Sequence, residues 1–336
     1  MKAWEKIDVK LDDGKIAEAI APIIISASRS TDIPAFYSEW FFNRLNRGYL
    51  TWINPFNRQE QHVSFKNCRL IVFWTKNPEP IIPYLEILDR KGINYYFHYT
   101  LNDYEIDGLE PNVPELSKRI STFKKLSQLL GKEKVIWRFD PLILTNQIKV
   151  HTLLDKIKKV GEEIHRYTNK LVISFADINE YKKVQNNLQK GEVNYEEFSK
   201  EKMIELAKGL QKINEIFKLK IGTCAEDIDL FNYGIDKNRC IDDELIVELF
   251  KEDRKLMNFI GYTPNTQLGL FDESYKYNPK LKDKGQRKIC GCIISKDIGM
   301  YNTCNHLCTY CYANHSANIV KKNVESHNYS FQSIIK

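Results

Sequence analysis

Short apolar segments rich in β-branched and aromatic residues alternate along this chain with longer segments in which apolar residues recur at helical spacing. Each apolar segment is nearly continuous in apolar character, as expected for strands that are buried on both faces of a sheet. Six strand and helix units in succession predict a parallel sheet covered by helices. The six predicted strands are 22–28, 70–74, 94–101, 135–139, 171–176 and 219–224.

The segments between the predicted strands indicate amphipathic helices. In each segment the apolar side chains fall on one helical face, and in one case Gly131 follows as a helix stop. A further short helix is predicted at 317–327, close to the end of the sequence. The remaining predicted helices are 31–45, 79–91, 116–130, 153–164, 203–217 and 242–250.

Two α/β architectures contain such a sheet: a doubly wound open sheet and a TIM-like βα barrel, complete or partial. No strand is followed by G-x-G-x-x-G or G-x-x-x-x-G-K-[ST], whereas polar residues follow almost every strand, where barrels build their active sites. We therefore predict a full or six-unit βα barrel over residues 1–252, with an irregular insertion at 48–69. The cysteine-rich segment 253–336 is expected to fold over the barrel mouth as part of one unit.

Composition and charge indicate the compartment and the partners. The first residues mix both charge signs, and no stretch approaches the ~20 apolar residues of a membrane span, so we expect a cytoplasmic protein without a membrane partner. In a reducing compartment the eight cysteines are better explained by metal or redox chemistry than by disulfides. The net charge of +6 permits a nucleic-acid partner, but no basic stripe interleaved with aromatic residues supports one.

Three of the cysteines lie within eight residues, in the stretch "YNTCNHLCTYCYAN". Cys304, Cys308 and Cys311 have the spacing C-x3-C-x2-C. Three thiolates on one loop can hold three irons of a [4Fe–4S] cube, whereas an electron-transfer cluster normally uses four cysteines. The remaining iron would then be open to a ligand from solution.

A zinc ion is the alternative for these three cysteines. His306 or His315 would complete a tetrahedral site of the kind that zinc prefers. Structural zinc sites usually take two ligand pairs from separated turns, and this crowded stretch does not have that pattern. The spacing therefore favours the iron–sulfur cube.

Cys304, Cys308, Tyr310 and Cys311 resemble the motif of the radical S-adenosylmethionine enzymes. Nearly the whole chain, including "SASRSTDIPAFY", "FWTKNP", "DIGMYNTC" and "CTYCYAN", also resembles an uncharacterised bacterial family, a domain of unknown function with such a cysteine cluster at its C-terminus. The first resemblance implies a [4Fe–4S] cluster whose open iron binds S-adenosylmethionine. It also implies reductive cleavage of that cofactor to methionine and a 5′-deoxyadenosyl radical, which abstracts hydrogen from an unknown substrate. An electron donor such as flavodoxin or ferredoxin would be the partner.

The sequence departs from that superfamily in one respect. The superfamily motif usually follows the first barrel strand, whereas here it follows six predicted strands. The C-terminal segment would therefore have to fold back over the barrel mouth as a permuted element, with "DIGMYNT" as its approach. The usual cofactor contacts cannot be transferred by their order along the chain.

Four more cysteines could form a second site. Cys290 and Cys292 flank a glycine, so both sulfurs can face one ion, and Cys224 and Cys240 lie at or after the sixth strand. These four could hold an auxiliary [4Fe–4S] cluster or a structural zinc ion. The alternative is that they are buried thiols without a ligand, since free cysteine is often buried.

Three residues are candidates for a catalytic role. Arg138 and Asp140 are two apart, so they share one face of a strand, and Arg138 could bind a carboxylate or phosphate while Asp140 orients it. A buried ion pair without a substrate role is the alternative. Tyr310 could shield the cube or relay a hydrogen atom.

Four residues at strand ends are candidates for cofactor binding. Lys76 and Asn77 follow the second strand and could contact the cofactor carboxylate, although Lys76 could also reach solvent. Glu226 follows the sixth strand and could bind an amino group or a ribose, or it could cap a helix. Ser174 lies at the end of the fifth strand.

Two other functions remain open on sequence grounds. One is a zinc-stabilised barrel that binds nucleic acid or protein, and the other is a hydrolase whose iron–sulfur cluster is only structural. The identity of the metal and the cleavage of S-adenosylmethionine separate these alternatives from the radical enzyme.

Overall fold

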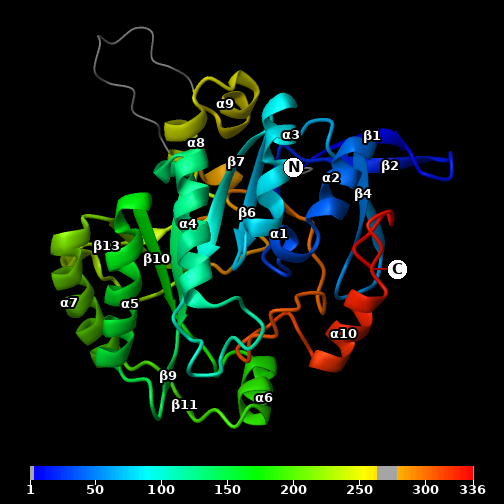
Figure 1. The fold of residues 1–336 in the computed structure, drawn as a ribbon. Coiled ribbons are helices and arrows are strands. Elements are labelled where there is room, and N and C mark those ends of the chain that lie inside the picture. Colours follow the sequence, from blue (N-terminus) through cyan, green and yellow to red (C-terminus); the bar gives the residue numbers. More distant parts are fainter. Residues whose placement is uncertain (1–3, 263–277, 336) are drawn as a thin grey trace, which may run out of the picture.

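An eight-stranded parallel sheet forms the centre of the protein, and helices pack on its outer face (Figure 1). The computed structural model describes residues 4–262 and 278–335 of the 336-residue chain. Residues 263–277 of the predicted C-terminal segment lie outside the described residues. The strands of the sheet are β3 (Ile24–Ala27), β6 (Leu70–Thr75), β7 (Asn94–Thr100), β8 (Val135–Leu142), β10 (Lys170–Phe175), β12 (Lys220–Cys224), β13 (Ile235–Asn238) and β14 (Lys296–Asp297).

The strands follow one another across the sheet in chain order, with one exception. The spatial order is β13-β12-β10-β8-β7-β6-β3-β14, so the last strand in the sequence lies beside β3. Lys296 is paired with Ile25, and Asp297 with Ser26. In the described part of the chain β13 and β14 do not pair with each other, so no closed barrel is detected. The predicted α/β fold with a large parallel sheet is confirmed, but the complete TIM-like barrel is not.

All six strands predicted from the sequence form, with bounds within three residues of those expected. The two additional strands have no apolar run that could have indicated them. β13 has the sequence IDKN, and β14 consists of only Lys296 and Asp297. As a strand of two residues, β14 makes too few ladder hydrogen bonds to connect the sheet to β13 at its other edge.

Helices form at every position where the spacing of apolar residues predicts one. The first predicted helix is divided at Tyr37, and Asp32 caps its first part by accepting a hydrogen bond from the backbone N–H of Ala35 at 3.0 Å. The α-helices are α1 (Ile33–Phe36), α2 (Ser38–Arg47), α3 (Leu85–Arg90), α4 (Leu116–Leu130), α5 (Val150–Ile164), α6 (Lys182–Lys190), α7 (Lys200–Phe217), α8 (Asp243–Phe250), α9 (Arg254–Ile260) and α10 (Ala317–Glu325). The 3-10 helices are η1 (Glu79–Tyr84), η2 (Lys132–Lys134), η3 (His165–Tyr167), η4 (Phe231–Tyr233) and η5 (Pro279–Leu281).

Two small sheets complete the fold. The larger has the order β1-β2-β5-β4, and β4 and β5 form an antiparallel pair within the segment 48–69. The prediction of an irregular insertion there is therefore wrong, because polar residues of β5 interrupt its apolar pattern. The strands outside the central sheet are β1 (Glu5–Lys10), β2 (Ile16–Ala21), β4 (Tyr49–Ile53), β5 (Glu60–Ser64), β9 (Leu144–Thr145) and β11 (Tyr195–Glu196).

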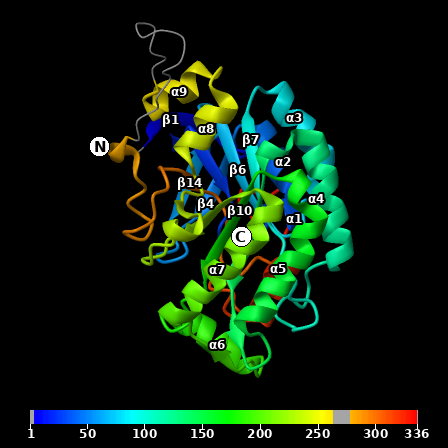
Figure 2. The same cartoon turned by 90° about the vertical axis from the view of Figure 1, so that its left-hand side faces the viewer.

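The central sheet is buried on both faces. Ile71 and Phe73 of β6 pack in the larger apolar cluster with the outer helices, whereas Leu70 and Val72 belong to a second cluster with α8 and α9. Figures 1 and 2 show α4 and α5 side by side over the outer face of the sheet. Both faces of the sheet are thus filled, and the carboxyl ends of the strands are left for a cavity.

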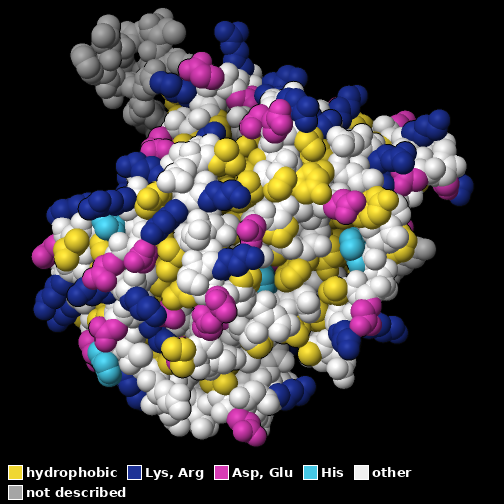
Figure 3. Space-filling view, in the orientation of Figure 1, with side chains coloured by type: hydrophobic (Ala, Val, Ile, Leu, Met, Phe, Trp, Pro, Cys, Tyr) yellow, Lys and Arg dark blue, Asp and Glu magenta, His cyan; other side chains and the backbone are white. Residues whose placement is uncertain are grey.

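The outer surface carries charges of both signs. On the face shown in Figure 3, Lys and Arg side chains of the described residues are interspersed with Asp and Glu. None of the helices in the described part of the chain has the length and apolar character needed to cross a membrane.

Candidate functional site

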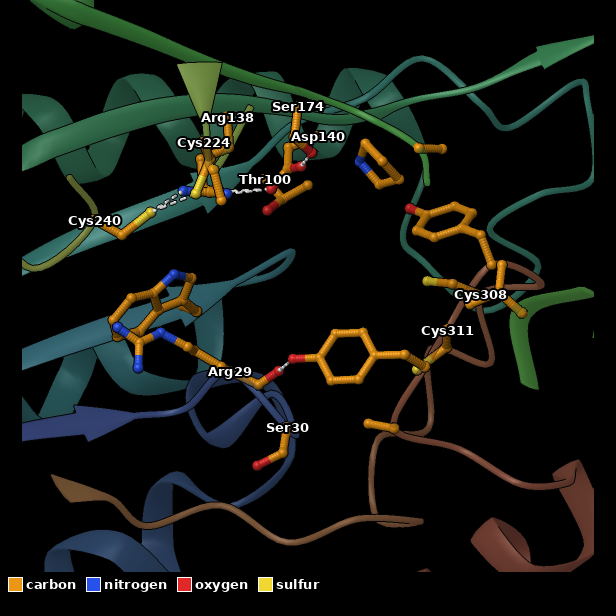
Figure 4. Close-up of a pocket in the computed structure, with 18 of the residues that line it drawn as sticks. Arg29, Ser30, Thr100, Arg138, Asp140, Ser174, Cys224, Cys240, Cys308 and Cys311 are labelled. Atoms are coloured by element: carbon orange, nitrogen blue, oxygen red, sulfur yellow. Dashed lines mark hydrogen bonds and ion pairs between the residues drawn. The ribbon is translucent and has the colours of Figure 1, made fainter. Parts of the chain in front are cut away.

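A cavity of about 410 Å³ lies at the carboxyl ends of the parallel strands. Strand-end residues form one wall, and the loop that follows β14 forms the opposite wall (Figure 4). Ligands of parallel α/β folds bind at this end of the strands. The strand-end residues in the wall include Arg29, Trp74, Thr100, Arg138, Ser174 and Cys224.

Cys304, Cys308 and Cys311 all line this cavity, so the C-terminal segment folds back over the strand ends. Two amide side chains hold the loop in place. Asn314 donates from Nδ2 to the carbonyl oxygen of Cys304 at 2.9 Å, and Asn187 of α6 donates to that of Cys311 at 3.1 Å. The three sulfur positions are therefore fixed by contacts within the loop and by a neighbouring helix.

The two histidines considered as zinc ligands do not complete a site with these cysteines. His306 is buried, and its Nε2 lies 2.8 Å from Oδ2 of Asp32. Its Nδ1 lies 3.4 Å from the carbonyl oxygen of Asn112, so both ring nitrogens have partners. His315 is exposed and does not line the cavity. Among the described residues, no group of three or more Cys, His, Asp or Glu side chains is arranged as a metal site.

The hydroxyl of Tyr310 lies in a closed polar network. It donates to Glu110 and accepts hydrogen bonds from Lys76 Nζ at 3.0 Å and from Asn102 Nδ2 at 3.3 Å. Burial by itself would raise the pKa of Glu110, but Lys76 and Arg119 outweigh it and hold the pKa at about 2. This network anchors the ring of Tyr310 beside Cys311, and its role in catalysis stays a prediction.

The predicted cofactor residues Lys76 and Asn77 do not present free polar groups to the cavity. The ammonium group of Lys76 is paired with Glu110 at 2.7 Å, although the residue lines the cavity. Asn77 is not among the lining residues; its Oδ1 accepts a hydrogen bond from the N–H of Glu79 at 3.3 Å, at the start of η1. Both residues follow the end of β6, so their position in the sequence does not distinguish them. The geometry of the turn places Lys76 at the cavity and Asn77 at the start of η1.

Arg138, Asp140 and Ser174 form one hydrogen-bonded group in the cavity wall. Arg138 donates from Nε to Asp140 Oδ2 at 3.0 Å and from Nη1 to the sulfur of Cys240 at 3.0 Å. Ser174 donates to the other carboxylate oxygen of Asp140. Arg138 and Asp140 lie on one face of the strand, as predicted, and they contact each other. This pairing agrees with both predicted roles, the buried ion pair and the substrate-binding group.

Glu226 lines the cavity, and one of its oxygens accepts a hydrogen bond from the backbone N–H of Phe175 at 2.9 Å. Burial raises the pKa of Glu226 to about 7. The other carboxyl oxygen can therefore carry a proton near neutral pH. Such a group can donate a hydrogen bond to a ligand or hold a proton for it.

Arg29 is a further polar group of the cavity wall. Its guanidinium lies over the ring of Trp74, 4.9 Å from the ring centroid. Its Nη2 is buried and has no hydrogen-bond partner in the described part of the chain. Its carbonyl oxygen accepts a hydrogen bond from the Tyr312 hydroxyl at 2.6 Å, a contact that Figure 4 shows crossing the cavity.

Sequence reasoning missed several residues of this site, above all Glu110, Asn102 and Trp74. Glu110 lies in the loop after β7, ten residues beyond the strand, where no spacing rule points to the cavity. Asn102 lies two residues after the end of β7. The sequence offers one signal for Glu110, namely that this charged residue has no oppositely charged residue close to it in the chain.

Four of the five remaining cysteines, Cys224, Cys240, Cys290 and Cys292, line the same cavity. Figure 4 shows Cys224 and Cys240 on the side away from the C-terminal loop. The sulfurs of Cys224 and Cys240 are 3.3 Å apart, and the sulfur of Cys292 accepts a hydrogen bond from the N–H of Cys240 at 3.1 Å. The structure thus brings together the four residues that the sequence grouped. Cys68 is buried away from the cavity.

Comparisons with known proteins give a family and a weak similarity to solved structures. A solved structure of a protein assigned as an alpha-L-fucosidase from Bacteroides thetaiotaomicron VPI-5482 has 10% sequence identity and a TM-score of 0.22. That comparison covers 59% of this chain and 75% of the other, and a similarity so low carries no argument. No curated protein matches the chain at a significant level. The model of a family described as a domain of unknown function (DUF1848) matches residues 24–313, a range that contains every residue lining the cavity, and the chain therefore belongs to this family.

Proposed function

We propose that this protein is a radical S-adenosylmethionine enzyme. In this proposal Cys304, Cys308 and Cys311 hold a [4Fe–4S] cluster, which reductively cleaves S-adenosylmethionine to give a 5′-deoxyadenosyl radical that acts on an unknown substrate. The observation that carries the proposal is that three thiols border one cavity while His306, the histidine between them, is turned to Asp32.

The donor set fits such a cluster. Thiolates are the ligands that iron–sulfur clusters take, and all three come from one short loop. The loop is held by Asn314 and Asn187 through its backbone carbonyls, so the sulfurs are free of these contacts. Both ring nitrogens of His306 have hydrogen-bond partners, so this histidine is not free to serve as a fourth ligand.

The place of the loop in the sheet also supports the proposal. In the superfamily that the motif resembles, the motif follows the first barrel strand. Here it follows β14, which is last in the sequence but lies at one end of the sheet, beside β3. A permuted, incompletely closed barrel would put the motif after the first strand in space. The other strands follow one another across the sheet in the same order as in the chain, which agrees with this arrangement.

The residues of the cavity would bind and orient the cofactor and the substrate. A volume of about 410 Å³ is within the range of small-molecule sites. Arg29 offers a buried N–H without a partner, and Glu226 offers a carboxyl group that is partly protonated near neutral pH. Tyr310 and its partner Glu110 would keep the cysteine loop in place. Glu226 is thus better placed for a ligand than Lys76 or Asn77.

The test is anaerobic reconstitution of the full chain with iron and sulfide, followed by reduction in the presence of S-adenosylmethionine. We expect the wild type to bind about four irons per chain and to release 5′-deoxyadenosine. The Cys304→Ala, Cys308→Ala, Cys311→Ala variant should do neither. Cys68→Ala is the matched control, because this thiol is remote from the cavity, and it should behave as the wild type.

Three results would contradict the proposal. Release of 5′-deoxyadenosine by the triple variant would show that these cysteines are not the site. One zinc per chain at the three cysteines, with no cofactor cleavage, would favour the zinc-stabilised binding module. Bound iron without cleavage would favour the hydrolase with a structural cluster. The electron donor, such as flavodoxin or ferredoxin, stays a prediction.

A further inference from the structure

Four cysteines from separate parts of the chain meet at one edge of the central sheet. Cys224 ends β12, and Cys240 follows β13, which pairs with β12 through Cys224 and Asn238. Cys290 and Cys292 lie just before β14, the strand at the opposite edge. A backbone hydrogen bond of 3.1 Å from Ile293 to Ile241 brings the two segments together. The four thiols therefore lie where the two unpaired edges of the sheet approach each other.

The sulfur atoms lie close to one another and to backbone donors. Those of Cys224 and Cys240 are 3.3 Å apart, and all four cysteines line the same cavity. The Cys292 sulfur also accepts hydrogen bonds from two backbone N–H groups, that of Cys240 at 3.1 Å and that of Ile241 at 3.5 Å. Backbone donors aimed at sulfur stabilise thiolates, the form that binds metal.

Positive charge surrounds this group. Arg138 donates to the Cys240 sulfur at 3.0 Å, and it shares its guanidinium with Asp140. Arg29 lies within electrostatic range of Cys292 and Cys240, and its buried Nη2 has no hydrogen-bond partner in the described part of the chain. Asp297 and Asp283 also lie within electrostatic range of Arg29 and balance part of its charge, and thiolates at Cys292 and Cys240 would add to that balance.

We propose that Cys224, Cys240, Cys290 and Cys292 bind one Zn²⁺ ion in a tetrahedral site. Each thiol loses its proton to solvent when its sulfur binds the ion. Four thiolates and one Zn²⁺ carry a net charge of −2, which the two guanidinium groups of Arg29 and Arg138 face. All four positions of the ion are taken by sulfur, so the site is structural and has no open position for a substrate.

The spacing of the sulfurs favours a single ion over a second cubane. Zn–S bonds of ~2.3 Å in a tetrahedron put the sulfurs about 3.8 Å apart. The 3.3 Å between Cys224 and Cys240 is close to this value, whereas a cubane needs its cysteines on four different irons, much farther apart. Among the described residues, no three such side chains already surround one point. Small rotations of the side chains suffice to bring the sulfurs around an ion.

The ion would hold the two edges of the sheet together, as hydrogen bonds between the first and last strands do in a closed barrel. In the described residues β13 and β14 do not pair, and the four ligands come from the segments beside these two strands. Zinc would therefore join the two ends of the open sheet. It would also fix the segment that leads, through β14, to Cys304, Cys308 and Cys311.

The experiment uses the full-length Cys304→Ala, Cys308→Ala, Cys311→Ala variant, which cannot hold the cluster of the proposed function. Metal analysis after purification with zinc present should find about one zinc per chain. Replacement of zinc by Co²⁺ should give strong sulfur-to-cobalt charge-transfer absorption and the visible bands of tetrahedral cobalt. Adding Cys290→Ser and Cys292→Ser should lower the zinc content at least tenfold, whereas adding Cys68→Ala should not change it.

Three results would overturn this proposal. They are the absence of zinc and of the cobalt spectrum, iron with sulfide in place of zinc, and a Cys224–Cys240 disulfide that accounts for the two thiols. The cobalt spectrum is read on the variant with all four ligands present, so it does not depend on the folding of the serine variants. Cofactor cleavage by the wild type is not involved, so the zinc site and the radical enzyme can fail separately.

Discussion

His306 Nε2 lies 2.8 Å from Oδ2 of Asp32, although the two residues are 274 positions apart in the sequence. The same carboxylate caps α1 through the N–H of Ala35 and accepts the backbone N–H of Lys76 at 2.7 Å. Asp32 therefore joins the start of α1, the end of β6 and the loop that carries the cysteines. A single buried carboxylate thus fixes the position of a loop formed at the other end of the chain.

The Asp32→Asn variant tests this relationship. The amide keeps an oxygen for one N–H, but it lacks the charge and cannot accept on both oxygens as the carboxylate does. We expect the free energy of unfolding to fall by about 1–3 kcal/mol. We also expect reconstituted iron to be lost faster to a chelator. Urea denaturation and iron release measure the two effects.

Asp13→Asn is the control, because Asp13 is exposed and pairs only with Lys15. It should change the free energy of unfolding by less than about 0.5 kcal/mol. An Asp32→Asn variant as stable as this control would contradict the anchoring role.

The Tyr310→Phe variant tests the polar network beneath the cysteine loop. It removes the hydroxyl that joins Glu110, Lys76 and Asn102 but keeps the ring. We expect a loss of about 1–3 kcal/mol in the free energy of unfolding, because buried partners are left unpaired. If Tyr310 acts only as an anchor and shield, the release of 5′-deoxyadenosine per bound cluster stays within about twofold.

Tyr329→Phe is the matched control, since Tyr329 is exposed and its change should affect neither quantity. A cofactor-cleavage rate that falls a hundredfold at unchanged iron content would contradict the anchor and support a direct chemical role for the phenol.

Stability should depend on pH through Glu226. Burial raises its pKa in the folded protein from the usual 4.5 to about 7, so the folded protein binds more protons than the unfolded chain between these two values. Stability should therefore fall as pH rises through this window, by at most ~1.4 kcal/mol per pH unit from this group. Glu226→Gln keeps the oxygen that accepts from Phe175, and the fall due to this group should disappear.

Thermal unfolding of wild type and variant from pH 4 to 8 measures this effect. The exposed Glu215→Gln variant is the control and should keep the wild-type profile. A Glu226→Gln profile parallel to that of the wild type would show that Glu226 does not hold the extra proton.

The Arg138→Lys variant separates an ion pair from a substrate-binding group. Lysine keeps the charge but cannot reach Asp140 and the Cys240 sulfur together with a planar fork. Since both contacts are internal, we expect a stability loss of about 1–3 kcal/mol and cofactor cleavage within about threefold of wild type. Calorimetry and a cleavage assay on matched cluster content measure these quantities.

Arg166→Lys, at an exposed position, serves as the reference and should leave both quantities unchanged. A large loss of activity in Arg138→Lys at wild-type stability would assign Arg138 to the substrate instead.

The sequence predicts the main sheet well because its strands are buried on both faces. A strand such as β6, with the sequence LIVFWT, is apolar at nearly every position and cannot be mistaken for a loop. By contrast, β14 consists of one lysine and one aspartate, and its pairing with β3 depends on contacts made across most of the chain. Closure of the barrel could not be judged from the sequence for this reason.

The candidate site was predicted where strand ends alone decide the position. Ser174 and Glu226 line the cavity because each lies near the end of a parallel strand or just after it, whereas Arg138 lies four residues before the end of β8. Asn77 also follows a strand, yet the turn directs it to η1. The partners of Tyr310 and His306 come from more than 190 residues away, and no local pattern encodes them.

The position of β14 has a consequence for biosynthesis. This strand and the three cysteines after it leave the ribosome later than every other strand of the central sheet, although their place is beside β3. A nascent chain can therefore form most of its core before any thiol of that loop exists. The wall of the pocket that carries Cys304, Cys308 and Cys311 is therefore added only after the other strands of the central sheet have been made.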